Sequence, residues 1–352
     1  MKNVLVTGAT GFIGQNVVQE LLANDYNVTA TDIKGTDFSR LPNINCIESD
    51  ITNKESLEKV VKNQELIVNV AGLVDLNTNP KLLDAVNHYG VKNICEVAKE
   101  FGVKKIIQVS SMGIYGKNNK VPLDEDDEKK PKNNYEISKF KGEQEAFKHL
   151  NHLEIIAVRP STVYGFGSLH NAILALFAMK KKKTLSSLKE GPLLSHIHVE
   201  DVARAIVFLA YHPNAIGEAY NLADNKPLNS FEMTSALLQP LGIEVKESIP
   251  YSKSLFKILK SIAQKMPKKI YSYINKKLEN KWLNFTEENH LKQRFFPKID
   301  PIWLDYLTAN KVISNKKLKA LGFVFKYPDS RIGLKAMVEE YIDRNHLPKV
   351  SL

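Results

Sequence analysis

Residues 4–14 read Val-Leu-Val-Thr-Gly-Ala-Thr-Gly-Phe-Ile-Gly, and this stretch decides the fold of the 352-residue chain. Its β-branched start predicts a buried strand over residues 4–7, and residues 12–24 predict a helix. Between them, Gly8 permits a tight turn, Gly11 lets the backbone approach a pyrophosphate, and Gly14 lets the helix pack closely on the strand. The helix start offers free N–H groups and a positive dipole end to phosphates. The stretch therefore predicts a dinucleotide-binding strand–turn–helix unit.

Short apolar runs continue to alternate with amphipathic segments as far as Pro160. This alternation predicts a doubly wound parallel sheet of the α/β class, with right-handed crossovers. The further strands are expected at residues 28–32, 43–48, 66–70, 105–110 and 154–159, and the further helices near 82–101 and 134–150.

After Pro160 the rhythm changes. We expect a helix near residues 171–183, short strands at 197–199 and 219–222, and a helix from about Glu200. The pattern predicts a Rossmann-type domain over residues 1–165, with later returns near 195–225. Residues 166–352 are expected to form mainly a smaller, mostly helical substrate-binding region.

Acidic residues stand at the end of the second expected strand and just after the third. Asp32 stands where a carboxylate accepts the ribose hydroxyls of the adenosine half and repels a 2′-phosphate, which favours NAD over NADP, although Lys34 lies close by. Asp50 and Ile51 follow the third strand, at a place suited to the adenine ring.

Tyr135 and Lys139 are four residues apart, which brings their side chains to one face of a helix. A nearby ammonium stabilises a phenolate and lowers the pKa of the tyrosine toward the working pH. Ser110 and Ser111 end the fifth strand, and ligands bind at the carboxyl ends of strands in such sheets. A Ser-Tyr-Lys acid/base site is therefore predicted. A serine nucleophile is not, because no Gly-x-Ser-x-Gly elbow surrounds the serines.

The motifs together resemble the extended short-chain dehydrogenase/reductases, the NAD-dependent epimerase/dehydratase family. The resemblance covers about residues 1–240, with a closing segment at 321–323. In family order, the matching segments lie at 7–14, 50–51, 69–72, 109–116, 131–139, 159–165, 198–203 and 217–222.

The resemblance implies a role for each matching residue and NAD as the cofactor. The catalytic set would be Ser111, Tyr135 and Lys139, with Ser111 preferred to Ser110 because it keeps the spacing to Tyr115. Positions on the cofactor would be Gly8, Gly11, Phe12, Ile13, Gly14, Asp32, Asp50, Ile51, Ala71, Asn87, Tyr135 and Lys139.

Two positions depart from the family's nucleotide-sugar members. Those members often carry Asn where Thr162 stands, and an Arg-x-Gly-Asp-like segment where this chain has residues 296–301. The departures point toward the reductase and hydroxysteroid-dehydrogenase-like branches.

Several other features favour ordinary structural roles. Two cysteines, Cys46 and Cys95, are too few for a disulfide framework or a four-cysteine zinc site. His196 and His198 lack an evident third ligand, so we predict no metal site. The acidic run over residues 124–128 is expected to be a solvated loop, and the lysine run over 180–183 a solvated helix end.

Much of the net charge of +10 comes from residues 252–281, where lysines alternate with Leu, Ile and Phe around Pro267. Two interpretations stay open: a basic amphipathic segment on an anionic membrane surface, or a substrate-domain helix with a solvated basic face. Because the first strand begins at once and no run approaches the length of a bilayer span, we expect a cytoplasmic protein, with membrane-surface association under the first interpretation.

The predicted function is an oxidoreductase that transfers hydride at a secondary alcohol or ketone carbon of a sterol-, lipid- or small-molecule-like substrate. The alternative is a nucleotide-sugar epimerase or dehydratase, in which the hydride returns to the same substrate. A non-catalytic dinucleotide sensor is a third. A small-molecule substrate is the expected partner, with no nucleic acid, because the lysine run lacks interleaved aromatic residues. The resemblance also makes a homodimer reasonable.

Overall fold

The computed structural model describes residues 2–74, 78–168, 171–179 and 184–349. The lysine run at 180–183 lies outside the described residues. The chain divides into two compact units: one formed by Met1–Ser161, Val199–Ala223 and Ile313–Lys326, the other by Thr162–His198, Asp224–Val312 and Tyr327–Leu352. The boundaries of the cofactor and substrate regions expected from the sequence stay a prediction.

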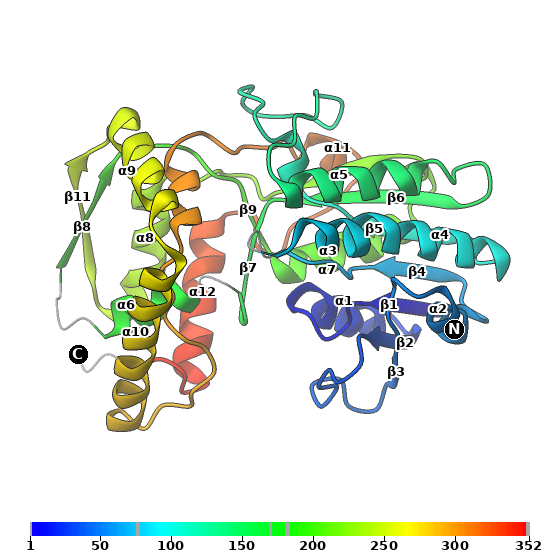
Figure 1. Cartoon of the computed structure of the whole chain (residues 1–352), viewed down its shortest axis with the longest axis horizontal. Helices are drawn as coiled ribbons and strands as arrows, with labels where there is room; N and C mark the ends of the chain where they lie inside the picture. Colours follow the sequence, from blue (N-terminus) through cyan, green and yellow to red (C-terminus); the bar gives the residue numbers. More distant parts are fainter. Residues whose placement is uncertain (1, 75–77, 169–170, 180–183, 350–352) are drawn as a thin grey trace. The chain divides into compact units, whose positions relative to one another are not determined.

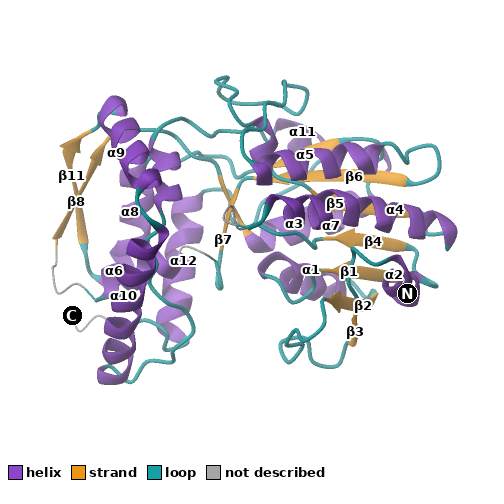
Figure 2. Cartoon of the chain, viewed as in Figure 1, coloured by secondary structure: helices purple, strands orange, loops and turns teal. Residues whose placement is uncertain are grey.

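The first unit contains a seven-stranded parallel sheet with the strand order β10-β6-β5-β4-β1-β2-β3 (Figures 1 and 2). This confirms the predicted doubly wound fold, with the order reversing between β1 and β4. The strands are β1 (Asn3–Thr7), β2 (Asn27–Asp32), β3 (Asn45–Glu48), β4 (Leu66–Asn69), β5 (Lys105–Val109), β6 (Glu154–Pro160) and β10 (Ala219–Leu222).

Helices cover the sheet. Helix α2 packs beside α4, which packs beside α5, whereas α1 packs beside α7. The segment before α4 is continuous with it but contains a π-helical turn over Ala85–Tyr89. The helices are α1 (Phe12–Ala23), α2 (Lys54–Val61), α3 (Pro80–Asp84), α4 (Gly90–Glu100), α5 (Asn134–Phe147), α7 (Val199–Tyr211) and α11 (Lys316–Ala320).

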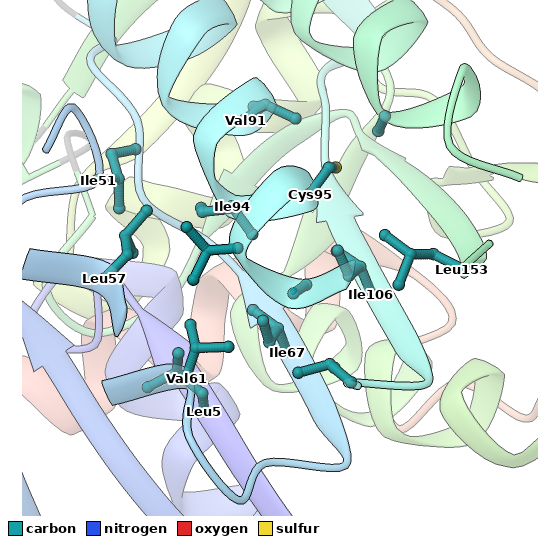
Figure 3. Close-up of a cluster of buried hydrophobic side chains, with 14 of the residues drawn as sticks. Leu5, Ile51, Leu57, Val61, Ile67, Val91, Ile94, Cys95, Ile106 and Leu153 are labelled. Atoms are coloured by element: carbon teal, nitrogen blue, oxygen red, sulfur yellow. The ribbon is translucent and has the colours of Figure 1, made fainter. Parts of the chain in front are cut away.

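The core of this unit joins strands to helices across one face of the sheet (Figure 3). Leu5 and Ile67 from the strands meet Leu57 of α2 and Ile94 of α4, all essentially buried. Cys95 lies in the same cluster, where it packs as a small apolar side chain. Full burial of each aliphatic side chain contributes about 1.5–3 kcal/mol, so this layer holds the strand ends in fixed positions.

The second unit is mainly helical, but it also has two small sheets. Strand β7 (Thr162–Tyr164) pairs with β9 (His196–His198), and β8 (Thr184–Lys189) pairs with β11 (Glu244–Pro250). The helix expected over 171–183 is described only over Asn171–Ala178, and the strand pair β8–β11 was not expected. The other helices are α8 (Ser230–Leu238), α9 (Lys253–Lys265), α10 (Lys268–Glu288) and α12 (Ser330–Asp343).

Candidate active site

The sequence-predicted site residues lie at the carboxyl ends of five neighbouring strands, on helix α5 and, for Asn87, in the π-helical turn before α4. The glycine turn joins β1 to α1, Asp32 ends β2, and Asp50 follows β3. Ala71 follows β4, and Ser111 follows β5. Because parallel strands end at one edge of the sheet, positions far apart in the sequence share one side of the first unit.

A glycine stands at each of these three positions of the β1–α1 turn for a different steric reason. Gly8 has a φ of +62°, and a Cβ there would lie 2.7 Å from the Cα of Ala71. A Cβ on Gly14 would overlap the carbonyl oxygen of Gly8, because α1 packs directly on the turn. Gly11 is exposed, and among the described residues the atom nearest its ideal Cβ position is the carbonyl oxygen of Gly8, at 3.2 Å. Because Gly11 has no side chain, the backbone on the outer side of the turn stays accessible.

Asp32 ties this turn to β2. Its Oδ2 accepts hydrogen bonds from the backbone N–H of Thr10 (3.1 Å) and the hydroxyl of Thr10 (2.6 Å), and its Oδ1 accepts from the N–H of Ile33 (2.9 Å). The residue is half-buried, so part of it stays accessible to solvent. A carboxylate has about four acceptor positions, which leaves room for a further donor.

The turn fits the pyrophosphate of a dinucleotide. Gly11 is the N-cap of helix α1 and has no side chain to cap it, so a phosphate oxygen is a suitable acceptor for the N–H groups of Phe12 and Ile13. The bare outer side of Gly11 and the carboxylate of Asp32 flank this helix start. The residues therefore match the group that the sequence predicts.

The structure places Asp50, Ile51 and Asn87 in three different environments. The Oδ1 atom of Asp50 accepts from the N–H and hydroxyl of Thr52, both at 2.8 Å, whereas Ile51 is buried against Gly90 of α4. Asn87 is buried in the π-helical turn: its Oδ1 accepts from the N–H of Leu73 (2.8 Å) and its Nδ2 donates to the carbonyl of Leu73 (2.9 Å). Asn87 thus fixes the loop after β4.

The two serines after β5 differ in surroundings. Ser110 is buried, and its N–H donates to the carbonyl of Val158 at 2.7 Å. Ser111 is half-buried, and its Oγ accepts from the N–H of Gly113 at 3.0 Å, which leaves the hydroxyl proton to donate elsewhere. The ideal Cβ position of Gly113 lies 3.3 Å from Oγ of Ser111 and 3.7 Å from Cε1 of Tyr135. Ser111 and Tyr135 therefore border the same small space.

Helix α5 begins immediately before the tyrosine because of a capping box. The side chain of Asn133 accepts from the N–H of Glu136 (2.9 Å), and Oε2 of Glu136 accepts from the N–H of Asn133 (3.3 Å). Ser138 donates to the carbonyl of Tyr135 at 2.9 Å. These bonds fix the first turn of the helix, and Lys139 follows one turn later on the same face.

Lys139 is a buried ammonium group. Only 6% of the residue is exposed, and its Nζ donates to the carbonyl of Val109 at 2.6 Å. Burial lowers the pKa of Lys139 to about 8, against the opposing attraction of Glu143. The ideal Cβ position of Gly72 is 3.5 Å from this Nζ, so the ammonium also borders the loop after β4.

A buried chain of hydrogen bonds leads away from this carbonyl across three strands. Gln108 donates to the carbonyl of Val109 (3.0 Å) and accepts from Nδ2 of Asn69 (2.7 Å). Oδ1 of Asn69 accepts from the hydroxyl of Thr7 (2.5 Å), whose oxygen accepts from the N–H of Ala71 (3.3 Å). In the sequence, Asn69 belongs to the matching segment 69–72, whereas nothing local marks Gln108, a glutamine in a strand, as part of such a chain.

A second polar cluster joins helix α5 to strands β6 and β10. Arg159 makes a bidentate ion pair with Glu143 (2.6 Å at its shortest) and donates to the hydroxyl of Tyr115 (2.8 Å), which donates to Asn221 (2.8 Å). Glu125 accepts from the N–H of Asn221 at 2.8 Å and is buried, and its burial raises its pKa. The expectation of a fully solvated acidic loop is therefore wrong at Glu125.

The histidines of β9 lie in an aromatic cluster of the second unit. The ring of His198 is tilted against that of Tyr327, with centroids 4.0 Å apart, and Tyr164 meets both His196 and His198 edge-on. Among the described residues, no group of three or more His, Cys, Asp or Glu side chains is arranged to hold a metal ion.

Comparison with known proteins identifies the family. The family model of the NAD dependent epimerase/dehydratase family matches residues 4–223. The decarboxylating sterol-4-alpha-carboxylate 3-dehydrogenase of Bos taurus is 28% identical over 263 residues, covering 71% of this chain and 73% of that protein. The UDP-glucose 4-epimerase of Vibrio cholerae is 27% identical over 250 residues, covering 67% and 75%.

Solved structures carry the same fold. The UDP-glucose 4-epimerase of Thermotoga maritima, solved with UDP-glucose, superposes with a TM-score of 0.71 at 22% identity and covers 97% of this chain and 99% of that one. The family match spans all seven strands of the parallel sheet and the predicted Ser-Tyr-Lys set. The chain therefore belongs to the NAD-dependent epimerase/dehydratase family, the extended short-chain dehydrogenase/reductases.

Proposed function

We propose that this chain is an NAD-dependent oxidoreductase that transfers a hydride at a secondary alcohol or ketone carbon, with Tyr135 as the acid/base group. The observation that carries the proposal is the buried ammonium of Lys139, one helical turn after Tyr135, on the helix that borders Ser111. Burying a charge costs free energy unless it is paired and hydrogen-bonded, and charged groups with perturbed pKa values gather at functional sites.

Each residue of the set has a task in the proton transfer. Tyr135 takes the proton of the substrate hydroxyl in oxidation and returns it in reduction. Lys139 is mostly protonated at neutral pH, since its pKa is about 8, and its positive charge favours the phenolate. Ser111 has a hydroxyl proton to donate to the same substrate oxygen, because its Oγ accepts from Gly113. General acid–base catalysis of this kind contributes roughly 10²–10⁴ in rate.

The cofactor would bind along the strand ends. The turn from Gly8 to Gly14 would hold the pyrophosphate, with Asp32 on the adenosine ribose and Asp50 and Ile51 near the adenine. Ala71 and Asn87 shape the loop after β4 beside Lys139, which would also hold the nicotinamide ribose. When bound, NAD supplies the acceptor and donor of the hydride.

The sterol-4-alpha-carboxylate dehydrogenase among the relatives supports a sterol- or lipid-like substrate, as do Thr162 and residues 296–301, which depart from the nucleotide-sugar pattern. The second candidate is a nucleotide-sugar epimerase or dehydratase. It is favoured by the similarity to UDP-glucose 4-epimerases over the same part of the chain. Both candidates use the same tyrosine, and they differ in whether the reduced cofactor accumulates.

The test combines a substrate panel with one variant. The protein is incubated with NAD and either secondary alcohols, including hydroxysterols, or UDP- and dTDP-sugars. Absorbance reports NADH, and mass spectrometry or NMR reports the product. Net NADH with an alcohol supports the first candidate, whereas an isomerised or dehydrated sugar without net NADH supports the second.

With the substrate in hand, Tyr135→Phe is expected to lower turnover by roughly 10²–10⁴ while NAD affinity is retained, because the hydroxyl is lost and the ring is kept. Tyr273→Phe, at an exposed tyrosine of α10, is the matched control and should leave turnover unchanged. Near-normal turnover of Tyr135→Phe would mean that the proton moves through another group, and the mechanism would have to be abandoned.

The family resemblance also supports a homodimer, which light scattering would measure directly. Among the described residues, no helix has both the length and the hydropathy to cross a bilayer.

A further inference from the structure

Helix α9 contacts the rest of the second unit through one face. Phe256 stacks on Tyr251, with ring centroids 5.6 Å apart, and Lys260 pairs with Asp305 at 2.6 Å. The carbonyl of Ala263 accepts from the hydroxyl of Tyr271 at 2.8 Å, which fastens the end of α9 to the start of α10. Positions 256, 260 and 263 are four and three residues apart, so these contacts define a single inner face.

A neighbouring side of α9 carries large apolar side chains that are exposed to solvent. Leu255, Ile258, Leu259 and Ile262 are 51%, 57%, 41% and 57% exposed. Their spacing of three, four and seven residues forms one stripe along the helix. None of the thirteen residues of α9 is buried. A contiguous exposed stripe of this kind marks an interaction surface rather than ordinary scatter of apolar residues. We call these four residues the apolar stripe.

The surroundings of the stripe are strongly basic. Residues 252–281 contain nine lysines and a single acidic residue, Glu279. Lys260 is neutralised by Asp305, whereas Lys257 and Lys265 of α9 are exposed to solvent. At the start of α10, Lys268 and Lys269 are exposed as well. These four are the basic rim of the stripe.

We propose that α9 lies in the interface of an anionic lipid membrane, with the apolar stripe in the acyl boundary and the basic rim at the headgroups. An exposed aliphatic stripe beside lysines is the chemistry of an interfacial helix. A second copy of the chain is a poorer occupant, because a two-fold interface would bring the basic rim against itself. Nucleic acid would leave the aliphatic stripe without a partner. The inference does not depend on the proposed hydride chemistry.

The test is sedimentation of the full chain with vesicles of phosphatidylcholine, with and without phosphatidylserine. Binding is expected only with phosphatidylserine at about 0.1 M salt, and release at about 1 M, where the Debye length falls from roughly 10 to roughly 3 Å. Lys257→Glu/Lys265→Glu is expected to weaken binding by about five-fold or more for each lysine. The charge-matched control Lys59→Glu/Lys62→Glu, at exposed lysines of the first unit, should bind like the parent.

Ile258→Asn/Ile262→Asn tests the stripe itself, with an expected loss of roughly ten-fold or more for each isoleucine. Ile332→Asn, at a 62% exposed isoleucine of α12, is its control. Circular dichroism should show that all variants are folded, since every substituted side chain is exposed. The proposal is overturned if anionic vesicles fail to bind the parent at low salt. It is also overturned if the stripe variant binds normally, or if the stripe variant lowers the mass of a dimer in light scattering without affecting lipid.

Discussion

Replacing Lys139 by methionine is expected to stabilise the folded chain at neutral pH while it abolishes activity. The ammonium is 6% exposed, and burial lowers its pKa from 10.5 to about 8. Each pH unit between the folded and unfolded pKa is worth about 1.4 kcal/mol, so the buried charge costs about 3 kcal/mol at pH 7. Methionine keeps a similar length and removes that cost.

We expect a net gain in stability because the substitution leaves few polar groups without a hydrogen-bond or ion-pair partner. The carbonyl of Val109 still accepts from Gln108 at 3.0 Å, and Glu143 keeps its ion pair with Arg159 at 2.6 Å. The lost hydrogen bond to Val109 offsets part of the gain, by about 1–2 kcal/mol. A net stabilisation of about 1–2 kcal/mol at pH 7 is therefore expected for Lys139→Met without added cofactor.

The pH dependence identifies the cause. The unfolded chain holds the Lys139 proton up to about pH 10.5, whereas the folded chain releases it near pH 8. The stability of the parent therefore rises between these values relative to the variant, and the advantage of Lys139→Met disappears toward pH 10.5. Urea unfolding followed by circular dichroism measures the free energy of unfolding of the parent and of the variant at each pH. A variant less stable than the parent at pH 7, or a difference that does not change between pH 7 and 10, would refute the reasoning.

Two further predictions concern the cofactor turn. Gly14→Ala should lower stability by about 1–3 kcal/mol and weaken NAD binding, because its Cβ would overlap the carbonyl oxygen of Gly8; an unchanged melting temperature and Kd would contradict this. Asp32 should make NAD bind at least a few-fold more tightly than NADP, and Asp32→Ser should reduce the ratio; equal affinities of the parent in calorimetry would exclude the assignment.

The parallel sheet and the gathering of the site could be predicted because their signals are local. The glycine turn, Asp32 and Ser111 each stand at the end of a strand or within two residues after it, and the ends of parallel strands share one edge. Tyr135 and Lys139 needed only the helical period. The fold and the family are confirmed, whereas the roles of the individual site residues stay predictions.

The missed features depend on partners far apart in the sequence. Glu125 stands in an acidic run that reads as solvated, but the N–H of Asn221, 96 residues away, satisfies its carboxylate inside the protein. Strand β8 has mixed polar and apolar residues, and it is a strand because β11 pairs with it about sixty residues later. No local pattern carries such pairings, since a short polar strand has no strong propensity of its own.

The hydrogen-bond chain from Ala71 to Val109 explains how the two halves of the site are held in one geometry. Each amide in it donates on one side and accepts on the other, so Asn69 and Gln108 have partners at both ends although both are buried. At one end the chain holds the loop that packs on Gly8, and at the other it holds the carbonyl that accepts from Lys139. A shift of the β1–α1 turn would therefore strain helix α5 at Lys139. A fully satisfied buried network has this effect because leaving any one member unpaired costs about 1–3 kcal/mol.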